Sequence, residues 1–566
     1  MRILFFGLFG WGKSTKNWLS PVIIFLLAIP AMAQRDFYDN YRFTRADTLR
    51  GMLAPERSCY DVTFYDIHLK VDPDRKWIQG HVDIHFKALA SFDRLQVDLF
   101  QNMKIRSVRW KEQDLNYQRE KNAVFISFPP QEKGAAGSFR VEYEGSPIEA
   151  PMPPWDGGFV WSEDLNGNSW VGVACEGEGA SLWWPNKDHL SDEPDSARIS
   201  VAVPDPLQCI ANGNLRSKTP AGKNFTRYEW FVAYPINNYN ITLNIGDYAH
   251  FSDTYTAGDG DTLALDYYVM PYNLEKARKH FRQVKPTLAC FERYFGKYPF
   301  WNDGFALVET PYLGMEHQSA IAYGNNYMRG YLGSMIPADM NWDYIIVHET
   351  GHEYFGNSLG CRDLADMWIH ESFTTYMESL FVECSSGYSD AVRYLQGQRN
   401  FSNRQPILGP QDVNWHNWSG SDHYFKGAWV LHTLRHVIAD DELWFGLLRD
   451  FYEKYALQQI GTEDFIRFVN QRTGEDYTAF FEQYLWHPGI PVLQIKMEQK
   501  GENVKLTYRW EADVPGFDMP VLVESEGKKW RIKPSAAKTK TTTLENCRAE
   551  DLRVARELFL IQVKKM

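Results

Sequence analysis

The sequence predicts a multidomain protein: an N-terminal antiparallel β-sheet domain, a mainly helical domain and a small C-terminal β-sandwich. The chain has 566 residues, which is long enough for several domains. Apolar and polar residues alternate from Tyr60 to about Val269, as in strands that have one face in water. From Asn273 apolar residues recur at the helical period, and alternation returns after Pro491. We therefore expect domains over residues 34–269, 270–488 and 489–566.

The composition is that of a folded, acidic protein. Hydrophobic residues make up 44% of the chain and aromatic residues 15%, which is sufficient for extensive cores. The formal net charge is -12, and the basic residues form no cluster. An acidic chain without basic patches does not attract phosphate backbones or anionic lipids, so we expect no nucleic-acid partner. The sequence leaves the oligomeric state open.

Residues 1–33 have the pattern of a secretory signal peptide. Basic residues precede an apolar run over residues 21–30, and Ala31-Met32-Ala33 follows it. A membrane anchor is the alternative, but the run is shorter than a bilayer-spanning helix. We expect cleavage after Ala33, a periplasmic or secreted protein, and no membrane anchor after cleavage. The seven cysteines are scattered and form no CxxC pair, so their pairing stays open.

In the N-terminal domain, alternation predicts strands over residues 65–71, 82–88, 95–99, 140–144 and 197–203. Two acidic stretches lie between the later strands. Cys175–Gly179 alternates acidic residues with glycines, which is typical of a solvated loop. A second acidic cluster surrounds Pro194. It is either a calcium site or, as we expect, a loop held by Arg198.

In the helical domain, apolar residues at positions 274, 277, 281 and 284 share one helix face. Pro286 is expected to kink or restart this helix, and Gly296 to end it. Residues 305–308 have the pattern of a buried strand, and further helices are expected near 422–439, 441–455 and 462–471. In the C-terminal domain, strands are expected over residues 492–497 and 504–510.

The helical domain contains a metal-binding pattern. His348 and His352 are four residues apart, so on a helix both imidazoles lie on one face. Glu349 lies about 100° round the helix, too far for a third ligand but within reach of a metal-bound water. Glu371 follows His352 after a spacer of eighteen residues, in the first turns of a second helix that Asp366 can cap. Two imidazoles and one carboxylate are the ligands of a hydrolytic zinc site, so we expect one Zn²⁺ per chain.

Three further motifs accompany this pattern, and with them the sequence resembles the aminopeptidase N family of zinc metallopeptidases, which includes leukotriene-A hydrolase. His352–Asn357 is similar to the family's H-x-W-F-G-N, Gly314–His317 to its G-x-M-E-N and Tyr424–Ala428 to its Y-x-K-G-A. The HExxH pattern alone occurs by chance in roughly a few per cent of chains this long, but these partners argue against chance. The resemblance implies a thermolysin-like catalytic domain over residues 270–488. The large helical-repeat domain common at the family's C-terminus is expected to be missing.

The resemblance also implies roles for individual residues. Glu349 is expected to act as general base on a metal-activated water, and Tyr424 to stabilise the oxyanion. Glu316 is expected to bind the substrate's free α-amino group, with Glu176 where the family keeps a second Glu or Gln. The backbone near Gly314 is expected to align the peptide. From the residues alone, a core aromatic at a helix start is the favoured interpretation of Tyr424, and the alternative for both carboxylates is that they are loop residues.

The sequence departs from the family pattern around the metal motif, although no ligand and no base is lost. The departures concern the shape of the amine pocket, and they fall at His317, Tyr354, His370 and Ser372. We expect His317 to be a structural hydrogen bonder. Ser419 stands where leukotriene-A hydrolase has a second tyrosine, so epoxide hydrolysis is not expected.

These features predict an aminopeptidase that acts on peptides with a free N-terminus. One alternative is a zinc peptidase with endopeptidase or dipeptide-releasing specificity. Another is a catalytically inactive scaffold or binding module. The intact ligands, base and tyrosine argue against the inactive scaffold.

Overall fold

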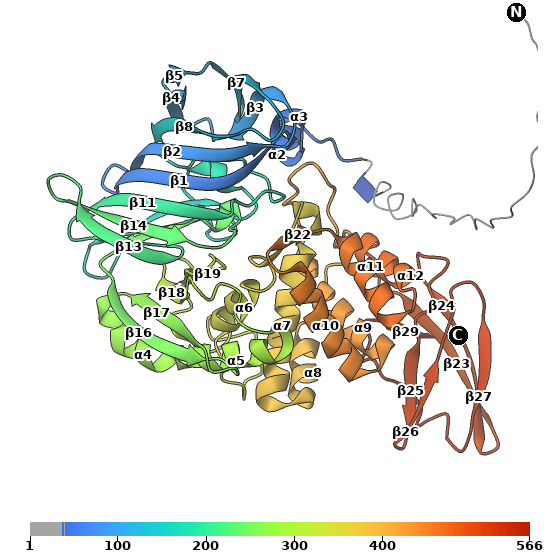
Figure 1. The fold of residues 1–566 in the computed structure, drawn as a ribbon. Coiled ribbons are helices and arrows are strands. Elements are labelled where there is room, and N and C mark those ends of the chain that lie inside the picture. Colours follow the sequence, from blue (N-terminus) through green and yellow to red (C-terminus); the bar gives the residue numbers. More distant parts are fainter. Residues whose placement is uncertain (1–36, 39) are drawn as a thin grey trace, which may run out of the picture.

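The computed structural model describes residues 37, 38 and 40–566, and Figure 1 shows its three regions. The signal peptide expected over residues 1–33 lies outside the described residues. Sheets form the N-terminal region, helices form the middle and two small sheets form the C-terminal end. The middle helices lie between the other two regions (Figure 1). The multidomain class is therefore confirmed. In the described part of the chain, no helix combines the length and apolarity needed to cross a membrane.

The N-terminal region is built on an eight-stranded sheet with the order β13-β14-β11-β1-β2-β8-β4-β5. Its pairs are antiparallel as expected, except that β1 and β11 run in parallel. The strands are β1 (Tyr60–Asp72), β2 (Trp77–Ala88), β4 (Lys104–Trp110), β5 (Gln113–Asp114), β8 (Ala136–Gly145), β11 (Ser196–Pro204), β13 (Asn214–Pro220) and β14 (Phe225–Val232).

Two smaller sheets pack with it around one apolar core. Their orders are β3-β7-β6 and β12-β15-β10-β9. The strands are β3 (Phe92–Asp98), β6 (Tyr117–Glu120), β7 (Ala123–Gln131), β9 (Gly158–Glu163), β10 (Ser169–Ala174), β12 (Gln208–Ala211) and β15 (Leu243–Gly246), with short helical turns η1 (Ala180–Leu182) and η2 (Asn238–Asn240).

The acidic cluster around Pro194 is not held by Arg198. Arg198 pairs with Asp66 on the neighbouring strand, at 2.6 Å. Within the cluster, Asp192 forms a buried ion pair with Lys187, and Asp188 accepts a hydrogen bond from the backbone N–H of Ser181 at 3.1 Å. The expected partner was wrong because the loop folds back onto its own N-terminal side, which the sequence pattern does not encode.

A five-stranded sheet, β16-β17-β18-β20-β19, connects the N-terminal region to the helices. Its strands are β16 (Ala249–Thr256), β17 (Thr262–Val269), β18 (Phe305–Glu309), β19 (Gly314–Met315) and β20 (Ile321–Tyr323). Leu265 and Val269 of β17 belong to the same apolar core as the helices, so this sheet continues across the boundary expected at residue 269. Strand β19 ends directly before Glu316 and thereby places this carboxylate.

Eleven described α-helices include the expected ones with small shifts. They are α2 (Arg45–Gly51), α3 (Pro55–Ser58), α4 (Leu274–His280), α5 (Val284–Phe295), α6 (Tyr344–His352), α7 (Trp368–Ser386), α8 (Tyr388–Gly397), α9 (Gly427–Ile438), α10 (Asp441–Tyr455), α11 (Thr462–Thr473) and α12 (Thr478–Phe481). Shorter turns are η3 (Pro271–Asn273), η4 (Phe281–Gln283), η5 (Leu364–Asp366), η6 (Asp422–Lys426) and η7 (Glu482–Trp486).

Pro286 lies in the first turn of α5, where the missing N–H breaks no helical hydrogen bond. Gly296 ends α5 with φ 96°, a conformation that favours glycine. Strands β21 (Leu359–Cys361) and β22 (Gln458–Ile460) form a parallel pair beside the helices.

The C-terminal region has two sheets, with orders β27-β24-β23-β29 and β26-β25-β28. Trp510 is fully buried between them and packs against Phe517, with ring centroids 5.3 Å apart. Their apolar core is continuous with that of the helices. The strands are β23 (Val492–Lys500), β24 (Asn503–Glu511), β25 (Val521–Ser525), β26 (Lys528–Ile532), β27 (Lys540–Leu544), β28 (Arg553–Val554) and β29 (Gln562–Lys565).

Candidate metal centre and active site

Helix α6 carries the two histidines. Asp343 caps its start by accepting hydrogen bonds from the backbone N–H groups of Ile345 at 2.9 Å and Ile346 at 3.2 Å. The four-residue spacing then brings the Nε2 atoms of His348 and His352 to 3.1 Å from each other. Both rings are buried.

Glu371, in the first turn of α7, completes the cluster. Its Oε2 lies 3.6 Å from His348 Nε2 and 3.4 Å from His352 Nε2. Helices α6 and α7 pack closely here, since a Cβ on Gly351 would lie 3.0 Å from Thr374 Cγ2. The expected cap was wrong: Asp366 lies in η5, which Asp363 caps. Asp366 instead accepts a hydrogen bond from the backbone N–H of Thr462 at 3.1 Å.

Each imidazole is held through its other nitrogen. His348 Nδ1 lies 2.6 Å from Glu378 Oε1, and His352 Nδ1 lies 3.0 Å from the Phe355 carbonyl oxygen. An Nδ1–H that donates to an oxygen leaves the Nε2 lone pair free for a metal. Glu371 Oε2 is buried with no hydrogen-bond partner in the described chain. Two free Nε2 lone pairs and one unpartnered carboxylate oxygen fit a zinc ion.

A second group, Glu316, Glu349 and His352, also has ligand atoms within 4.8 Å of one another. The group of His348, His352 and Glu371 is the better candidate for holding a metal. Only that group uses both imidazoles, whose Nδ1 atoms are already fixed. In the second group Glu316 already accepts a hydrogen bond from the Tyr239 hydroxyl at 3.1 Å. The second group therefore describes the acidic side of the same site.

Glu349 lies beside the cluster on α6, next to strand β19. Burial raises the pKa of Glu349 to about 7, although the nearby His348 and His352 act to lower it. A carboxyl with a pKa near neutrality can accept and release a proton within one reaction cycle. The strand passes so close that a Cβ on Gly314 would lie 2.9 Å from Glu349 Oε1. A side chain at this position would displace Glu349 or Ile345, so glycine preserves the placement of the carboxylate.

Glu316 and Glu176 line the same cavity from opposite sequence regions. Burial raises the pKa of Glu316, and that of Glu176 is raised well above its ordinary value by burial and by the negative charge of Glu316. Glu176 Oε1 is buried and has no hydrogen-bond partner in the described chain. Two buried carboxylates that line one cavity are suited to receive a cation.

Tyr424 lies in η6, a π-helical turn that precedes α9. Its ring lies nearly parallel to that of His348, with centroids 6.1 Å apart, and it lines the cavity. Burial, together with the charge of Glu371, holds the pKa of Tyr424 well above its ordinary value, so its hydroxyl keeps its proton. A π turn widens the helix by one residue, and such turns are frequent at functional sites.

The cavity around these residues has a volume of about 560 Å³, within the range of small-ligand sites. Its lining also contains aromatic side chains, those of Trp155, Tyr331, Trp415, Trp418 and Phe425. Trp155 is 58% exposed, which is unusual for so large an apolar side chain. The cavity therefore offers an acidic end and an apolar wall.

Sequence reasoning missed two residues of this site and the contact of a third. Glu378 lies seven residues after Glu371 on the same face of α7, a spacing that could have identified it. Tyr239 donates to the Glu316 side chain from another segment, and no sequence pattern points to it. Asn357 ends the motif that begins at His352, but the motif did not predict that its side chain donates to the Glu316 carbonyl oxygen at 2.7 Å. The expectation for His317 was wrong: it is buried, but neither ring nitrogen has a hydrogen-bond partner in the described chain.

The fold and the candidate metal site are similar to those of a zinc metallopeptidase domain. Residues 279–484 match the family model described as the peptidase family M1 domain. The expected resemblance to the aminopeptidase N family of zinc metallopeptidases is thereby confirmed. The expected roles of the individual residues stay predictions.

Related proteins agree with this family. The chain is 22% identical to aminopeptidase N of Escherichia coli over 351 residues, which are 59% of this chain and 39% of that protein. It is 20% identical to leucyl aminopeptidase of Saccharolobus solfataricus over 443 residues, 75% of this chain and 54% of that one. The chain thus spans about half the length of these relatives.

The fold is also that of a solved metallopeptidase. A variant of the M1 zinc metallopeptidase from Deinococcus radiodurans, bound to a Tyr-Ser-Ala substrate, superposes with a TM-score of 0.60 at 22% identity. The superposition covers 76% of this chain and 94% of that one. A variant described as a two-domain M1 zinc metallopeptidase, bound to L-tryptophan, gives a TM-score of 0.59 at 21% identity and covers 73% of this chain and 91% of that one.

Proposed function

We propose that this protein is a zinc-dependent aminopeptidase that hydrolyses the first peptide bond of peptides with a free N-terminus. The main observation behind this proposal is that one cavity contains both the metal cluster and the two carboxylates Glu316 and Glu176. Ligand atoms of His348, His352 and Glu371 lie within 4.8 Å of one another, and Glu316 and Glu176 line the same cavity. The metal cluster suits peptide hydrolysis, and the acidic side suits a terminal ammonium group.

His348, His352 and Glu371 would hold the metal. When bound, zinc supplies a Lewis acid that polarises a carbonyl group and makes a water nucleophilic. Glu349 would accept a proton from the attacking water and then give it to the leaving amine. Tyr424 would donate a hydrogen bond to the carbonyl oxygen as negative charge develops on it.

Glu316 and Glu176 would bind the α-ammonium group of the first residue, and the backbone at Gly314 would lie along the peptide. This arrangement would select the first peptide bond for cleavage, because the position of the bound ammonium group determines which carbonyl group reaches the metal cluster. A blocked amine would leave two buried carboxylates without a cation. The aminopeptidase names of the relatives, and the tripeptide bound to the Deinococcus radiodurans protein, support this proposal.

The proposal is tested with a panel of aminoacyl-nitroanilides and their N-acetylated counterparts. We expect turnover of several free-amine substrates and nearly none of acetylated ones. Glu349→Gln should lower kcat by about 10³-fold or more while zinc stays bound. Equal turnover of free and acetylated substrates would instead support the endopeptidase alternative. A purified protein that binds no zinc and gains no activity with zinc would support the scaffold alternative.

We also propose that the protein functions in an oxidising compartment, periplasmic or extracellular. The signal-peptide pattern over residues 1–33 supports this, as does the disulfide between Cys290 of α5 and Cys384 of α7. Alkylation of the denatured protein from cells should label five cysteines without reduction and seven after it. Labelling of all seven without reduction would contradict the proposal.

A further inference from the structure

Helix α2 packs between the N-terminal region and a segment without regular structure, residues 407–421, which we call the rim segment. A capping box of Thr44 and Asp47 starts the helix. At its end, a Cβ on Gly51 would lie 2.3 Å from the backbone nitrogens of Val413 and Asn414, so only glycine allows this approach. The rim segment continues into the cavity wall through Trp415 and Trp418.

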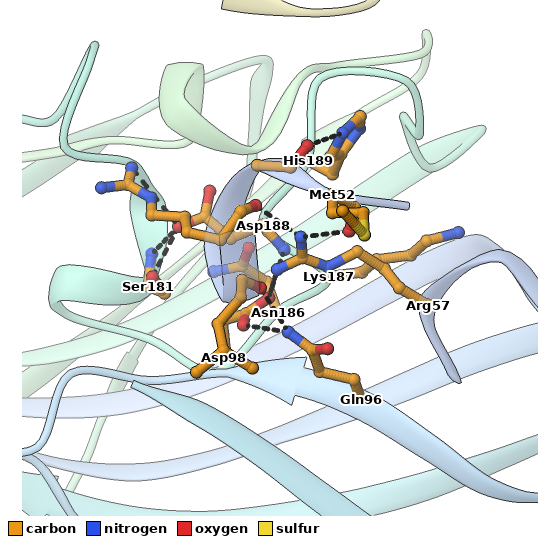
Figure 2. Close-up of polar contacts among 12 residues, drawn as sticks. Met52, Arg57, Gln96, Asp98, Ser181, Asn186, Lys187, Asp188 and His189 are labelled. Carbon is orange, nitrogen blue, oxygen red and sulfur yellow. Dashed lines mark hydrogen bonds and ion pairs between the residues drawn. The ribbon is translucent and has the colours of Figure 1, made fainter. Parts of the chain in front are cut away.

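The last carbonyl groups of α2 are bound by side chains of the N-terminal region. Helix ends normally leave such carbonyls without intrahelical partners. Gln96 Nε2 donates to the Leu49 carbonyl at 2.9 Å, and Arg57 donates to the Met52 carbonyl at 3.2 Å. His189 Nε2 lies 3.1 Å from the Gly51 carbonyl (Figure 2). These bonds fix the position of the helix end.

Arg57 connects this helix end to the loop that follows β10. It is fully buried and forms an ion pair with Asp98. Asp98 also accepts hydrogen bonds from Gln96 at 2.8 Å and from the backbone N–H of Asp188 at 3.3 Å. Figure 2 shows Arg57 in the middle of these groups, between Asp98 and the Met52 carbonyl. The helix end and the Asp188 segment therefore form one rigid unit.

From this unit Arg50 reaches the loop that carries Glu176. Arg50 Nη2 donates to the Gly177 carbonyl at 3.0 Å, and Asn414 Nδ2 of the rim segment donates to the same oxygen at 3.0 Å. A Cβ on Gly179 would lie 2.2 Å from Arg50 Nη2, so the loop fits tightly around the guanidinium. The loop backbone is thus held from two sides, directly after Glu176.

Glu176 itself has no such restraint. Its Oε1 is buried without a hydrogen-bond partner in the described chain, and its carboxylate faces the cavity. The direction of this side chain therefore depends on the backbone that Arg50 and Asn414 hold. A displacement of about 1 Å at a binding group is enough to impair a reaction strongly.

We propose that Arg50 and Asn414 are positioning residues for the amine end of the substrate pocket. By clamping the Gly177 carbonyl they aim Glu176 at the substrate ammonium, so residues 44–57 belong functionally to the active site. This inference rests on the proposed aminopeptidase function. It assigns no chemical step to either residue.

The test compares two inhibitors that differ only in the amine. Leucine hydroxamate has an α-ammonium group, and 4-methylpentanoyl hydroxamate lacks it; both present the same metal-binding group. Inhibition constants are measured for the wild type, Arg50→Ala, Asn414→Ala and the double variant. Arg45→Ala on the same helix is the matched control, because Arg45 is exposed and pairs with Glu120 away from the cavity. Arg50→Lys, which keeps a donor, tests for rescue.

We expect each single variant to raise the inhibition constant of leucine hydroxamate by about tenfold. This is the effect of losing one hydrogen bond between a charged carboxylate and the ammonium group, here that of the displaced Glu176. The amine-free inhibitor should change by less than about twofold, since its contacts do not involve Glu176. The double variant should be little worse than either single one, because both donors share one acceptor. KM for aminoacyl-nitroanilides should rise more than kcat falls, and Arg50→Lys should recover part of the loss.

Unchanged leucine hydroxamate binding, or equal weakening of both inhibitors, would overturn the inference. A wild type that binds both compounds equally well would overturn the proposed amine site itself, so the two failures are distinguishable. Melting temperatures of all variants are compared with that of Arg45→Ala. If Arg50→Ala does not fold, Asn414→Ala on the rim segment carries the test alone.

Discussion

The metal cluster and the proposed amine end of the pocket are built in opposite ways. His348, His352 and Glu371 come from two consecutive helices, α6 and α7, that pack directly on each other. The amine end combines Glu176 after β10, Glu316 after β19 and supports from α2 and the rim segment. One site is local in sequence, whereas the other exists only when distant regions dock.

Because of this difference, the two sites should be disturbed by changes in different parts of the molecule. The metal cluster should persist whenever α6 and α7 are folded, because its ligands and their Nδ1 partners lie within residues 344–386. The amine end depends on the seam between the N-terminal region and the helices. Changes near the metal should therefore alter metal affinity or kcat, and changes at the seam should alter selectivity or stability.

After Glu349→Gln, the largest effect is expected for Tyr424→Phe. This variant keeps the ring that lies 6.1 Å from the His348 ring but removes the hydroxyl. Loss of one oxyanion donor lowers kcat by about 10²–10³-fold. Stopped-flow or steady-state kinetics should show this loss of kcat, and the zinc content of the variant should be unchanged. Loss of zinc from the variant would show instead that Tyr424 supports the metal cluster, and would break the division between the two sites.

The division between local and distant construction also explains what the sequence could predict. The two histidines of HExxH are spaced by one helical turn, and the later glutamate lies at the start of the next helix. Residue spacing was therefore enough to predict which three residues could share a metal. The cap expected at Asp366 was wrong because Thr462 competes for that carboxylate from another helix. Arg198 was assigned to the wrong acidic partner for the same reason: its true partner, Asp66, lies on a strand that becomes its neighbour only on folding.

Glu176 shows the limit most clearly. From the residues it was a solvated loop carboxylate, and only a family resemblance placed it in the site. Its actual setting depends on Arg50 and Asn414, which are far from it in sequence and belong to no motif. Long-range contacts between irregular segments leave no periodic signal, and so they require a structure.

An intermediate effect is expected for Glu378→Gln, which tests how local the metal cluster is. Glu378 Oε1 lies 2.6 Å from His348 Nδ1, and loss of its charge should weaken zinc binding by about 10–100-fold. Competition with a chelator measures this, and kcat at saturating zinc should change little. Glu383→Gln, on the same helix but paired with Arg435, is the control and should keep wild-type affinity. Equal effects of the two substitutions would mean that α7 acts as a whole, not through one hydrogen bond.

The smallest effect is expected at the seam, where Glu193 of the N-terminal region approaches Gly360 and Gln459. Burial raises the pKa of Glu193 to about 8, against a hydrogen bond from Gln459 that lowers it. The unfolded chain loses this proton near its ordinary pKa of about 4.5, whereas the folded protein keeps it up to about pH 8. The free energy of unfolding should therefore fall between these pH values through this group.

Glu193→Gln keeps the size and the donor partner but removes the titration. The variant should melt about 2–4 °C above the wild type at pH 8, and the difference should vanish near pH 4.5. Asp195→Asn, in the same loop but exposed, is the control and should melt like the wild type at both pH values. Melting curves recorded at constant zinc concentration check this. If Glu193→Gln raised the melting temperature equally at pH 4.5 and pH 8, the gain would come from packing, and the seam would not depend on a buried proton.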